Sequence, residues 1–150
     1  MFRIDIDSLD DPRVSAYRNL KDRELAREGD RFIAEGEAVV RRMLASPRHH
    51  CESLLCASSR VGRIASAVPE HVPVYVAPDA IVNAIIGFRF HSGIMAVGGR
   101  PVSSTLHDLF PPDRSPYTVL CCPNIANTDN LGALLRIAAG FGCSGVLLGE

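Results

Sequence analysis

The sequence contains no tryptophan, a single lysine and no apolar run long enough to span a bilayer. The missing apolar run argues against a membrane-spanning helix, which needs about 20 consecutive apolar residues. Hydrophobic residues make up 47% of the chain, which argues equally against wholesale disorder. Residues 1–7 mix acids with apolar side chains and do not resemble a secretory signal. We therefore expect a cytoplasmic protein with no membrane partner.

The cysteines form no C-x-x-C pair, and none has a histidine at the spacing typical of metal ligands. They are Cys51, Cys56, Cys121, Cys122 and Cys143. Cys121 and Cys122 lie in an apolar run, where a thiol packs as a small hydrophobic side chain. The pattern predicts reduced, mostly buried thiols and no metal site.

Since lysine is nearly absent, arginine supplies 15 of the 16 basic residues, and their distribution is uneven. Residues 1–31 contain seven basic and eight acidic residues, whereas residues 38–100 contain seven arginines and three acids. The planar guanidinium donates hydrogen bonds in pairs and suits phosphates and base edges. The basic middle favours nucleic-acid binding, although an excess of arginine also follows from codon composition alone.

Residues 1–30 are predicted to form a polar helical lead-in that begins near Asp10-Asp11-Pro12. Further along, helical and extended patterns alternate, as expected for an α/β fold with a sheet covered by helices. The expected helices are 39–44, 60–68 and 78–86, and the expected strands are 53–57, 72–76 and 93–97. Pro73 places the strand 72–76 near a sheet edge in this interpretation. Gly98-Gly99 is interpreted as a domain-boundary turn.

Residues 101–116, rich in proline and serine, are predicted to be a linker around a short helix at 106–110. A strand at 117–122, a helix at 131–140 and a strand at 145–148 then form one β-α-β crossover. Two parallel strands and one helix are too few to cover both faces of such a sheet. We therefore expect residues 117–150 to open a larger domain.

The loop 123–130 is polar and leads from that strand into that helix, at the edge where open α/β sheets place ligands. Asn130, or Asp129 beside it, is suited to cap the helix, and the free amides of the first turn would form an anion site. Arg136 follows Gly132 by four residues and should lie over it on the same face, leaning towards the helix N-terminus. Taken singly, each residue is better explained without a ligand: Asn130 as a helix cap, Gly132 as a packing residue and Arg136 as a solvated side chain.

The same helix is predicted to bury one stripe of side chains. The stripe consists of Leu131, Leu134, Leu135 and Ala138.

The spacing Asn130-x-Gly132-x-x-x-Arg136, followed by Ala138-Ala139-Gly140-Phe141-Gly142, resembles the first motif of the SpoU (TrmH) family of the SPOUT superfamily. Members are RNA 2′-O-ribose methyltransferases that use S-adenosyl-L-methionine. Residues 32–36 (Phe-Ile-Ala-Glu-Gly) and 91–96 (His-Ser-Gly-Ile-Met-Ala) are similar to the segments that open and close the substrate-binding domain of the same family. The resemblance spans residues 10–150. The chain departs from the family where Asn127-Thr128 replaces the usual Asp-Pro.

The resemblance implies that residues 1–100 form an RNA substrate-binding domain, a three-layer αβα sandwich similar to kink-turn-binding ribosomal proteins. Residues 117–150 would be the first β-α-β unit of a SPOUT (α/β knot) methyltransferase domain. Arg136 would position and activate the target ribose hydroxyl of rRNA or tRNA, and Asn130 would organise the site. The intact protein is implied to be a homodimer.

The residues that bind the methyl donor belong to later family motifs and are expected beyond residue 150. The 150-residue chain alone is therefore expected to be an inactive truncated form that binds no cofactor. Two alternatives stay open, a non-catalytic RNA-binding module and a fragment that oligomerises through its unfinished crossover.

Four residues are candidates for RNA contact, namely Arg41, Arg42, Arg89 and His91. Arg41 and Arg42 flank an apolar helical stripe, so they also fit a purely solvated helix face. His49-His50 is interpreted as a solvated turn.

Overall fold

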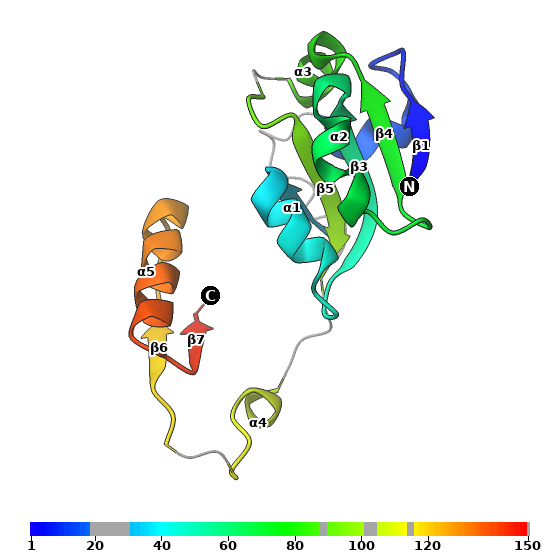
Figure 1. The fold of residues 1–150 in the computed structure, drawn as a ribbon. Helices are drawn as coiled ribbons and strands as arrows, with labels where there is room; N and C mark the ends of the chain where they lie inside the picture. Colours follow the sequence, from blue (N-terminus) through cyan, green and yellow to red (C-terminus); the bar gives the residue numbers. More distant parts are fainter. Residues whose placement is uncertain (19–30, 88–89, 101–104, 114–115, 150) are drawn as a thin grey trace. The chain divides into compact units, whose positions relative to one another are not determined.

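The structure is a computed structural model, and it describes residues 1–18, 31–87, 90–100, 105–113 and 116–149. The chain divides into two compact units. Unit 1 is Met1–Pro101 and unit 2 is Val102–Glu150 (Figure 1).

Unit 1 is built on a five-stranded mixed sheet with the strand order β1-β4-β3-β5-β2. The strands are β1 (Phe2–Asp5), β2 (Arg31–Glu35), β3 (His50–Ala57), β4 (Pro73–Ala77) and β5 (Ile94–Gly99). β1, β4 and β3 run parallel, whereas β5 is antiparallel to both β3 and β2. β2 therefore lies at one edge of the sheet and β1 at the other.

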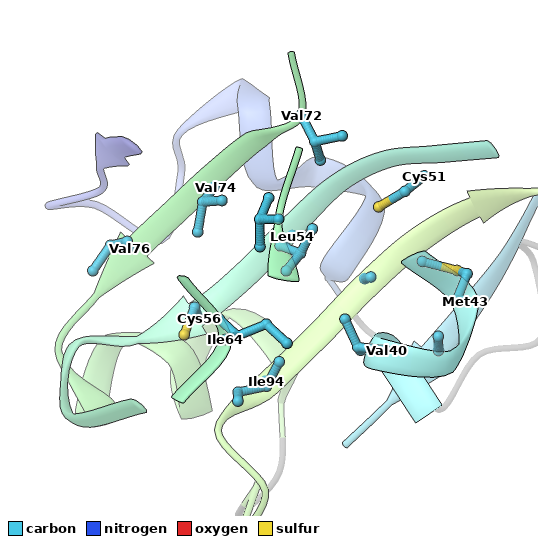
Figure 2. Packing of buried hydrophobic residues seen from close by; sticks show 13 residues of the cluster. Val40, Met43, Cys51, Leu54, Cys56, Ile64, Val72, Val74, Val76 and Ile94 are labelled. Atoms are coloured by element: carbon cyan, nitrogen blue, oxygen red, sulfur yellow. The ribbon is translucent and has the colours of Figure 1, made fainter. Parts of the chain in front are cut away.

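Helical segments pack on both faces of this sheet, because the strands alternate apolar side chains between two separate clusters. α1 (Glu37–Leu44) and α2 (Val61–Ile64) cover one face, where Val40, Met43 and Ile64 meet the strands (Figure 2). The short 3-10 helices η3 (Ser58–Arg60) and η4 (Ala65–Ala67) flank α2.

The opposite face is covered by α3 (Asp79–Ile86) and the 3-10 helix η1 (Pro12–Tyr17). Val14 and Tyr17 of η1 are fully buried there. The Tyr17 hydroxyl lies 2.7 Å from Ser53 Oγ of β3, and burial raises the pKa of this tyrosine far above its usual value. η1 is thus fastened to the sheet by a buried polar pair inside an apolar cluster.

A β-bulge in β3 decides which side chains reach which face. Cys51 is paired with Gly98 and Ser53 with Val97, so Glu52 is the additional residue. As a result, Cys51 joins the same cluster as Leu54 instead of following the simple alternation. Glu52 forms an ion pair with Arg31 of the edge strand, at 3.0 Å.

The predicted helical lead-in at 1–30 is wrong in its first residues, because Phe2–Asp5 is strand β1, parallel to β4. Apolar and charged residues alternate from Phe2 to Ile6 with the period of two that a strand requires. Asp11-Pro12 does begin a helical segment, with the Asp11 side chain as its cap. The rest of the prediction, residues 19–30, lies outside the described residues.

Two sheet predictions also need correction. β4 lies between β1 and β3 and is not an edge strand. Pro73 is tolerated because it is the first residue of the strand, where a missing N–H costs least. Gly98 and Gly99 belong to β5 and pair with β2 and β3, so they do not form a boundary turn. The helix expected at 60–68 is divided between α2 and its two flanking 3-10 helices.

Unit 2 contains β6 (Val119–Cys122), α5 (Thr128–Gly140) and β7 (Gly145–Leu148), after the short helix α4 (Leu106–Leu109). β6 and β7 are parallel, so the predicted β-α-β crossover is present. α4 starts with a capping box between Thr105 and Asp108.

The core of unit 2 is small. Ala138 of α5 and Cys122 of β6 are its buried apolar residues among those described. Leu131 and Leu134 are half-buried, but Leu135 is 44% exposed, so the predicted buried stripe is correct only in part. Because α5 packs only on one face of the two-stranded sheet, part of its apolar surface has no contact with the strands, and Leu135 belongs to that part.

Candidate functional site

The α5 entrance, which we define as residues 123–136, lies where strand β6 ends and helix α5 begins. β6 and β7 end side by side, and the Gly149 N–H donates to the Cys122 carbonyl at 2.9 Å. An added Cβ on Gly149 would lie 2.2 Å from the Pro123 carbonyl oxygen, so backbone meets backbone closely there. The polar loop therefore does leave the carboxyl edge of a parallel pair, as its sequence predicts.

The N-cap of α5 is Asn127, and the prediction of Asn130 or Asp129 is wrong. Asn127 Oδ1 accepts hydrogen bonds from the backbone N–H groups of Asp129, at 2.9 Å, and Asn130, at 3.0 Å. Asn127 and Asn130 have the same capping chemistry, and the extended backbone at Asn127 selects the earlier one. Asn130 is thus the third residue of the helix.

This cap also changes the predicted anion site. The N–H groups of Asp129 and Asn130 are paired with the Asn127 side chain, and the Leu131 N–H is paired with the Asn127 carbonyl. The first turn therefore has fewer free amides than the sequence suggested. An anion here would have to compete with Asn127.

Arg136 lies where its spacing predicts. A Cβ built on Gly132 would lie 4.0 Å from Arg136 Nη1, so the guanidinium extends back over the glycine on one helix face. The side chain is exposed, and among the residues that the structure describes it has no hydrogen bond or ion pair. Asn130 is exposed as well and likewise makes no side-chain hydrogen bond within the described part of the chain. Both side chains are available to an external ligand.

The RNA candidates of unit 1 differ in their availability. Glu37 lies between two arginines, 3.0 Å from Arg41 Nε and 2.7 Å from Arg63 Nε. Arg41 also donates to the Arg63 carbonyl. Arg42, one residue along α1, is exposed and has no such partner in the described ranges.

His91 is exposed in the bend before β5. Arg89 lies outside the described residues. Nothing brings Arg42 and His91 together among the contacts of the described residues.

Sequence reasoning missed the contact between Phe32 and His49. His49 is exposed, as the sequence predicts, but its ring also packs edge-to-face on Phe32 with 5.7 Å between ring centroids. His50, in turn, is the first residue of β3. An aromatic residue in an edge strand and a histidine just after a helix-ending proline were the available signals.

The cysteines are all free thiols. Cys51, Cys56 and Cys122 are buried as predicted, whereas Cys121 is exposed and Cys143 is half-buried. Burial raises the pKa of Cys51 and of Cys56 to about 11, which keeps both as unreactive thiols at neutral pH.

Within the described ranges, no three His, Cys, Asp or Glu side chains gather to hold a metal ion. No described helix is both long enough and apolar enough to cross a membrane.

Comparison with known proteins finds relatives that are named as tRNA/rRNA methyltransferases. An uncharacterized tRNA/rRNA methyltransferase of Mycobacterium tuberculosis is 31% identical over 97% of this chain. One from Mycobacterium bovis is 30% identical over the same share. The chain spans about half the length of these relatives, 51% in each case. No protein-family model matches the sequence.

Solved structures give the same picture for the fold. The AdoMet-bound rRNA methyltransferase of Sinorhizobium meliloti superimposes with a TM-score of 0.75 at 22% identity, over 99% of this chain and 55% of its own. An RNA 2′-O ribose methyltransferase superimposes with a TM-score of 0.67 at 23% identity, over 99% of this chain and 56% of its own. The chain thus has a mixed α/β fold found in RNA methyltransferases. The names of these relatives and the fold are consistent with the resemblance to RNA methyltransferases that the sequence motifs indicate.

Proposed function

We propose that this chain belongs to an S-adenosyl-L-methionine-dependent RNA 2′-O-ribose methyltransferase of the SpoU (TrmH) type, acting on rRNA or tRNA. The observation that carries the proposal is the exposed Arg136 guanidinium, which lies over Gly132 at the carboxyl edge of β6 and β7 and is unpaired among the residues that the structure describes. The names of the relatives and the RNA methyltransferase fold support it. In this proposal residues 117–150 open the SPOUT methyltransferase domain, after a linker at 101–116.

The chemistry assigned to Arg136 follows from its position. A ribose 2′-hydroxyl is a poor nucleophile, and its reaction becomes easier when a fixed positive charge stabilises the developing alkoxide. Arg136 has no described partner to neutralise it, so its guanidinium can bind the adjacent phosphate or the hydroxyl oxygen. Gly132 adds no side chain beneath it, so a sugar can approach the helix there. Asn130, with an amide that both donates and accepts, would orient the same nucleotide.

S-adenosyl-L-methionine would supply the methyl group, as the donor bound in the Sinorhizobium meliloti neighbour suggests. The described residues at the α5 entrance do not by themselves fit this molecule. The backbone N–H groups of Asp129, Asn130 and Leu131 are paired with Asn127, and that of Gly149 is paired with Cys122. We therefore assign these residues to RNA and not to the methyl donor.

Residues 1–100 are proposed to dock the RNA, as a three-layer αβα sandwich similar to kink-turn-binding ribosomal proteins. Helices on both faces of the sheet and the arginine-rich stretch 38–100 support this role. Arg42 and His91 are exposed candidates. Arg41 is a weaker one, because binding RNA would compete with its part-buried ion pair with Glu37.

One observation favours a second function, that of an RNA-binding module without catalysis. Unit 1 is compact and has two complete apolar clusters of its own. RNA binding that survives every substitution at the α5 entrance, in a protein that never methylates, would select this alternative.

A homodimer is proposed for the intact protein. The exposed apolar side chains of unit 2 support an interface there, since contact with a second copy would remove them from water. They include Leu135, Ile137, Phe141 and Leu148. Equilibrium sedimentation of the protein would test it.

Arg136→Ala in the full-length protein tests the catalytic assignment. We expect methyl transfer from radiolabelled S-adenosyl-L-methionine to rRNA or tRNA to fall by about 100-fold or more, as when one electrostatic stabiliser is removed. Arg136→Lys should restore part of the rate. Arg3→Ala removes another exposed arginine, in unit 1, and should leave the rate nearly unchanged. Full activity in Arg136→Ala would remove this residue from the mechanism.

A further inference from the structure

Unit 1 contains an apolar groove between helix α1 and the edge strand β2, with a volume of about 370 Å³. Ala34, Val39 and Met43 provide its aliphatic surface, and the rings of Phe32 and His49 provide an aromatic wall. The volume lies within the roughly 300–1,000 Å³ range of pockets that hold small organic groups. We refer to this feature as the α1 groove.

Gly98 of β5 gives the α1 groove its shape. A Cβ on Gly98 would lie 2.6 Å from Phe32 Cζ and 2.9 Å from Met43 Sδ, so both side chains occupy space that any other residue would fill. Figure 2 shows Met43 pointing from α1 towards the sheet beside Val40. The Phe32 ring therefore lies low against the sheet and leaves open space above it.

The polar groups of the groove select its ligand. Among the described residues that line the groove, the Arg42 guanidinium is the charged group and none is acidic. Ser46 Oγ lies 2.9 Å from His49 Nδ1, and this hydrogen bond fixes the ring beside Phe32 while Nε2 remains for a ligand. Arg48, two residues beyond Ser46, adds a second exposed cation near by. An aromatic wall combined with unopposed positive charge suits a flat, anionic ligand.

We propose that the α1 groove receives one unstacked base of a single-stranded RNA segment, with the base against Phe32 and His49 and an adjoining phosphate on Arg42. This inference rests on the proposed RNA-binding role of unit 1 and names the place where a base is held. Val39 is accessible to such a ligand, because this side chain of the groove is 54% exposed. Base stacking on aromatic side chains tolerates any sequence, so the groove would recognise an unpaired nucleotide and not a particular base.

The absence of tryptophan from the chain provides a direct reporter. In His49→Trp the introduced indole is the sole tryptophan and stands in the aromatic wall. The probes are a 12-nucleotide single-stranded oligo(A) RNA and an abasic ribose-phosphate oligomer of equal length and charge. We expect oligo(A) to quench the tryptophan emission and the abasic oligomer to leave it unchanged. His71→Trp, at an exposed turn residue that does not line the groove, is the control and should respond to neither.

A matched pair of arginine substitutions separates the groove from general charge attraction. Arg42→Ala and Arg48→Ala each remove one exposed guanidinium, and the Arg48 backbone N–H keeps its contact with Ser46. Measured by fluorescence anisotropy of labelled oligo(A), Arg42→Ala should weaken binding about ten-fold and Arg48→Ala about two- to three-fold. Val39→Glu, which places an acid in the groove, should weaken binding at least as much as Arg42→Ala. Circular dichroism would confirm that the variants are folded.

Three results would overturn the proposal. Equal weakening by Arg42→Ala and Arg48→Ala, with RNA still bound, would leave unit 1 as an electrostatic RNA binder and reject the base pocket alone. Equal quenching by oligo(A) and the abasic oligomer would reject base insertion, again without affecting RNA binding. Failure of the unsubstituted protein to bind oligo(A), rRNA or tRNA at low salt would reject the proposed RNA role and this inference together.

Discussion

Units 1 and 2 both contain parallel strands joined through helices, but they bury these elements to very different extents. In unit 1 the sheet has helical segments on both faces, and the interior strands β3, β4 and β5 are almost completely buried. In unit 2 the strands β6 and β7 are half-buried at most positions, and Phe141, at the end of α5, is 84% exposed. The comparison illustrates why a parallel sheet needs cover on two sides and more than two strands.

The units also differ in where their functional candidates lie. The α5 entrance of unit 2 is formed by a loop and the first turns of one helix, and Arg136 reaches solvent from it. The α1 groove of unit 1 is supported by a closed core in which Val40 and Met43 are buried. A site on a well-packed scaffold is held more rigidly than one on a unit with few buried contacts.

The largest expected difference between the units is the loss of stability when a leucine is replaced by alanine. Leu54→Ala in unit 1 should lower the free energy of unfolding by about 2–5 kcal/mol, because the side chain is fully buried and the cavity cannot collapse. Leu135→Ala in unit 2 should change it by less than about 0.5 kcal/mol, since this leucine is 44% exposed. Urea titrations followed by NMR signals from each unit would measure both. Similar costs for the two substitutions would show that Leu135 is packed in solution.

Two glycines provide an opposite pair of effects. Gly98→Ala should destabilise unit 1 by about 1–3 kcal/mol, because the new Cβ overlaps Phe32 and Met43. Gly132→Ala should stabilise α5 by about 0.5–1 kcal/mol, because its Cβ would meet only Arg136 Nη1, at an ordinary 4.0 Å. Thermal unfolding of each unit would check the two signs.

The Gly132 substitution has a second readout in the full-length protein. A stabilised but inactive Gly132→Ala variant would mean that the open surface beneath Arg136 serves the RNA. A stabilised and fully active variant would make this glycine dispensable and contradict the proposed approach of the sugar.

The smallest expected effect is a pH dependence present in both units. Hydrogen bonds donated by the Arg13 side chain and backbone lower the pKa of Asp11 from 3.8 to about 2, so the folded state favours the carboxylate. Asp11 therefore contributes stability above pH 3.8, and this contribution is lost as the pH falls towards 2. Asp108 in unit 2 has a lowered pKa through its side-chain and backbone hydrogen bonds with Thr105, and its contribution has the same sign.

Acid titration of the folded chain, followed by NMR, would measure both carboxyls. Asp11→Asn should remove the acid-dependent loss in unit 1 and leave that in unit 2, and Asp108→Asn should do the reverse. An Asp11 carboxyl that titrates at its usual value would show that Arg13 does not hold it in solution.

The sequence predicted the elements whose apolar periodicity is unambiguous. α3 and the crossover β6-α5-β7 lie close to their expected ranges. β1 was missed because its alternation is short and precedes a polar stretch, although period two is visible from Phe2 to Ile6. The prediction that β4 is an edge strand was wrong because a proline indicates an edge only when it lies within a strand, and Pro73 is the first residue of its strand.

The α5 entrance was predicted in its spacing but not in its hydrogen bonds. Four residues along a helix always share a face, so the position of Arg136 over Gly132 followed from the sequence alone. The choice of Asn127 over Asn130 as the cap depends on backbone angles that both residues can adopt, and the sequence does not decide between them. The α1 groove could not be found in advance, because Phe32, Val39 and His49 come together only when an edge strand, a helix and a loop are packed.

The additional residue in β3 has a consequence for how this strand can vary. Because Glu52 is the additional residue of the bulge, the alternation of side chains between the two faces of the sheet is interrupted at this position. Replacements at Cys51 act on the side of the sheet that carries α1, while Ser53 keeps its hydroxyl against Tyr17 on the other side. Deleting Glu52 would make Cys51 and Ser53 consecutive, and because they already face opposite sides the strand would become regular with both side chains in place. What the extra residue adds to unit 1 is therefore the carboxylate that pairs with Arg31 of the edge strand, and both layers keep their side chains.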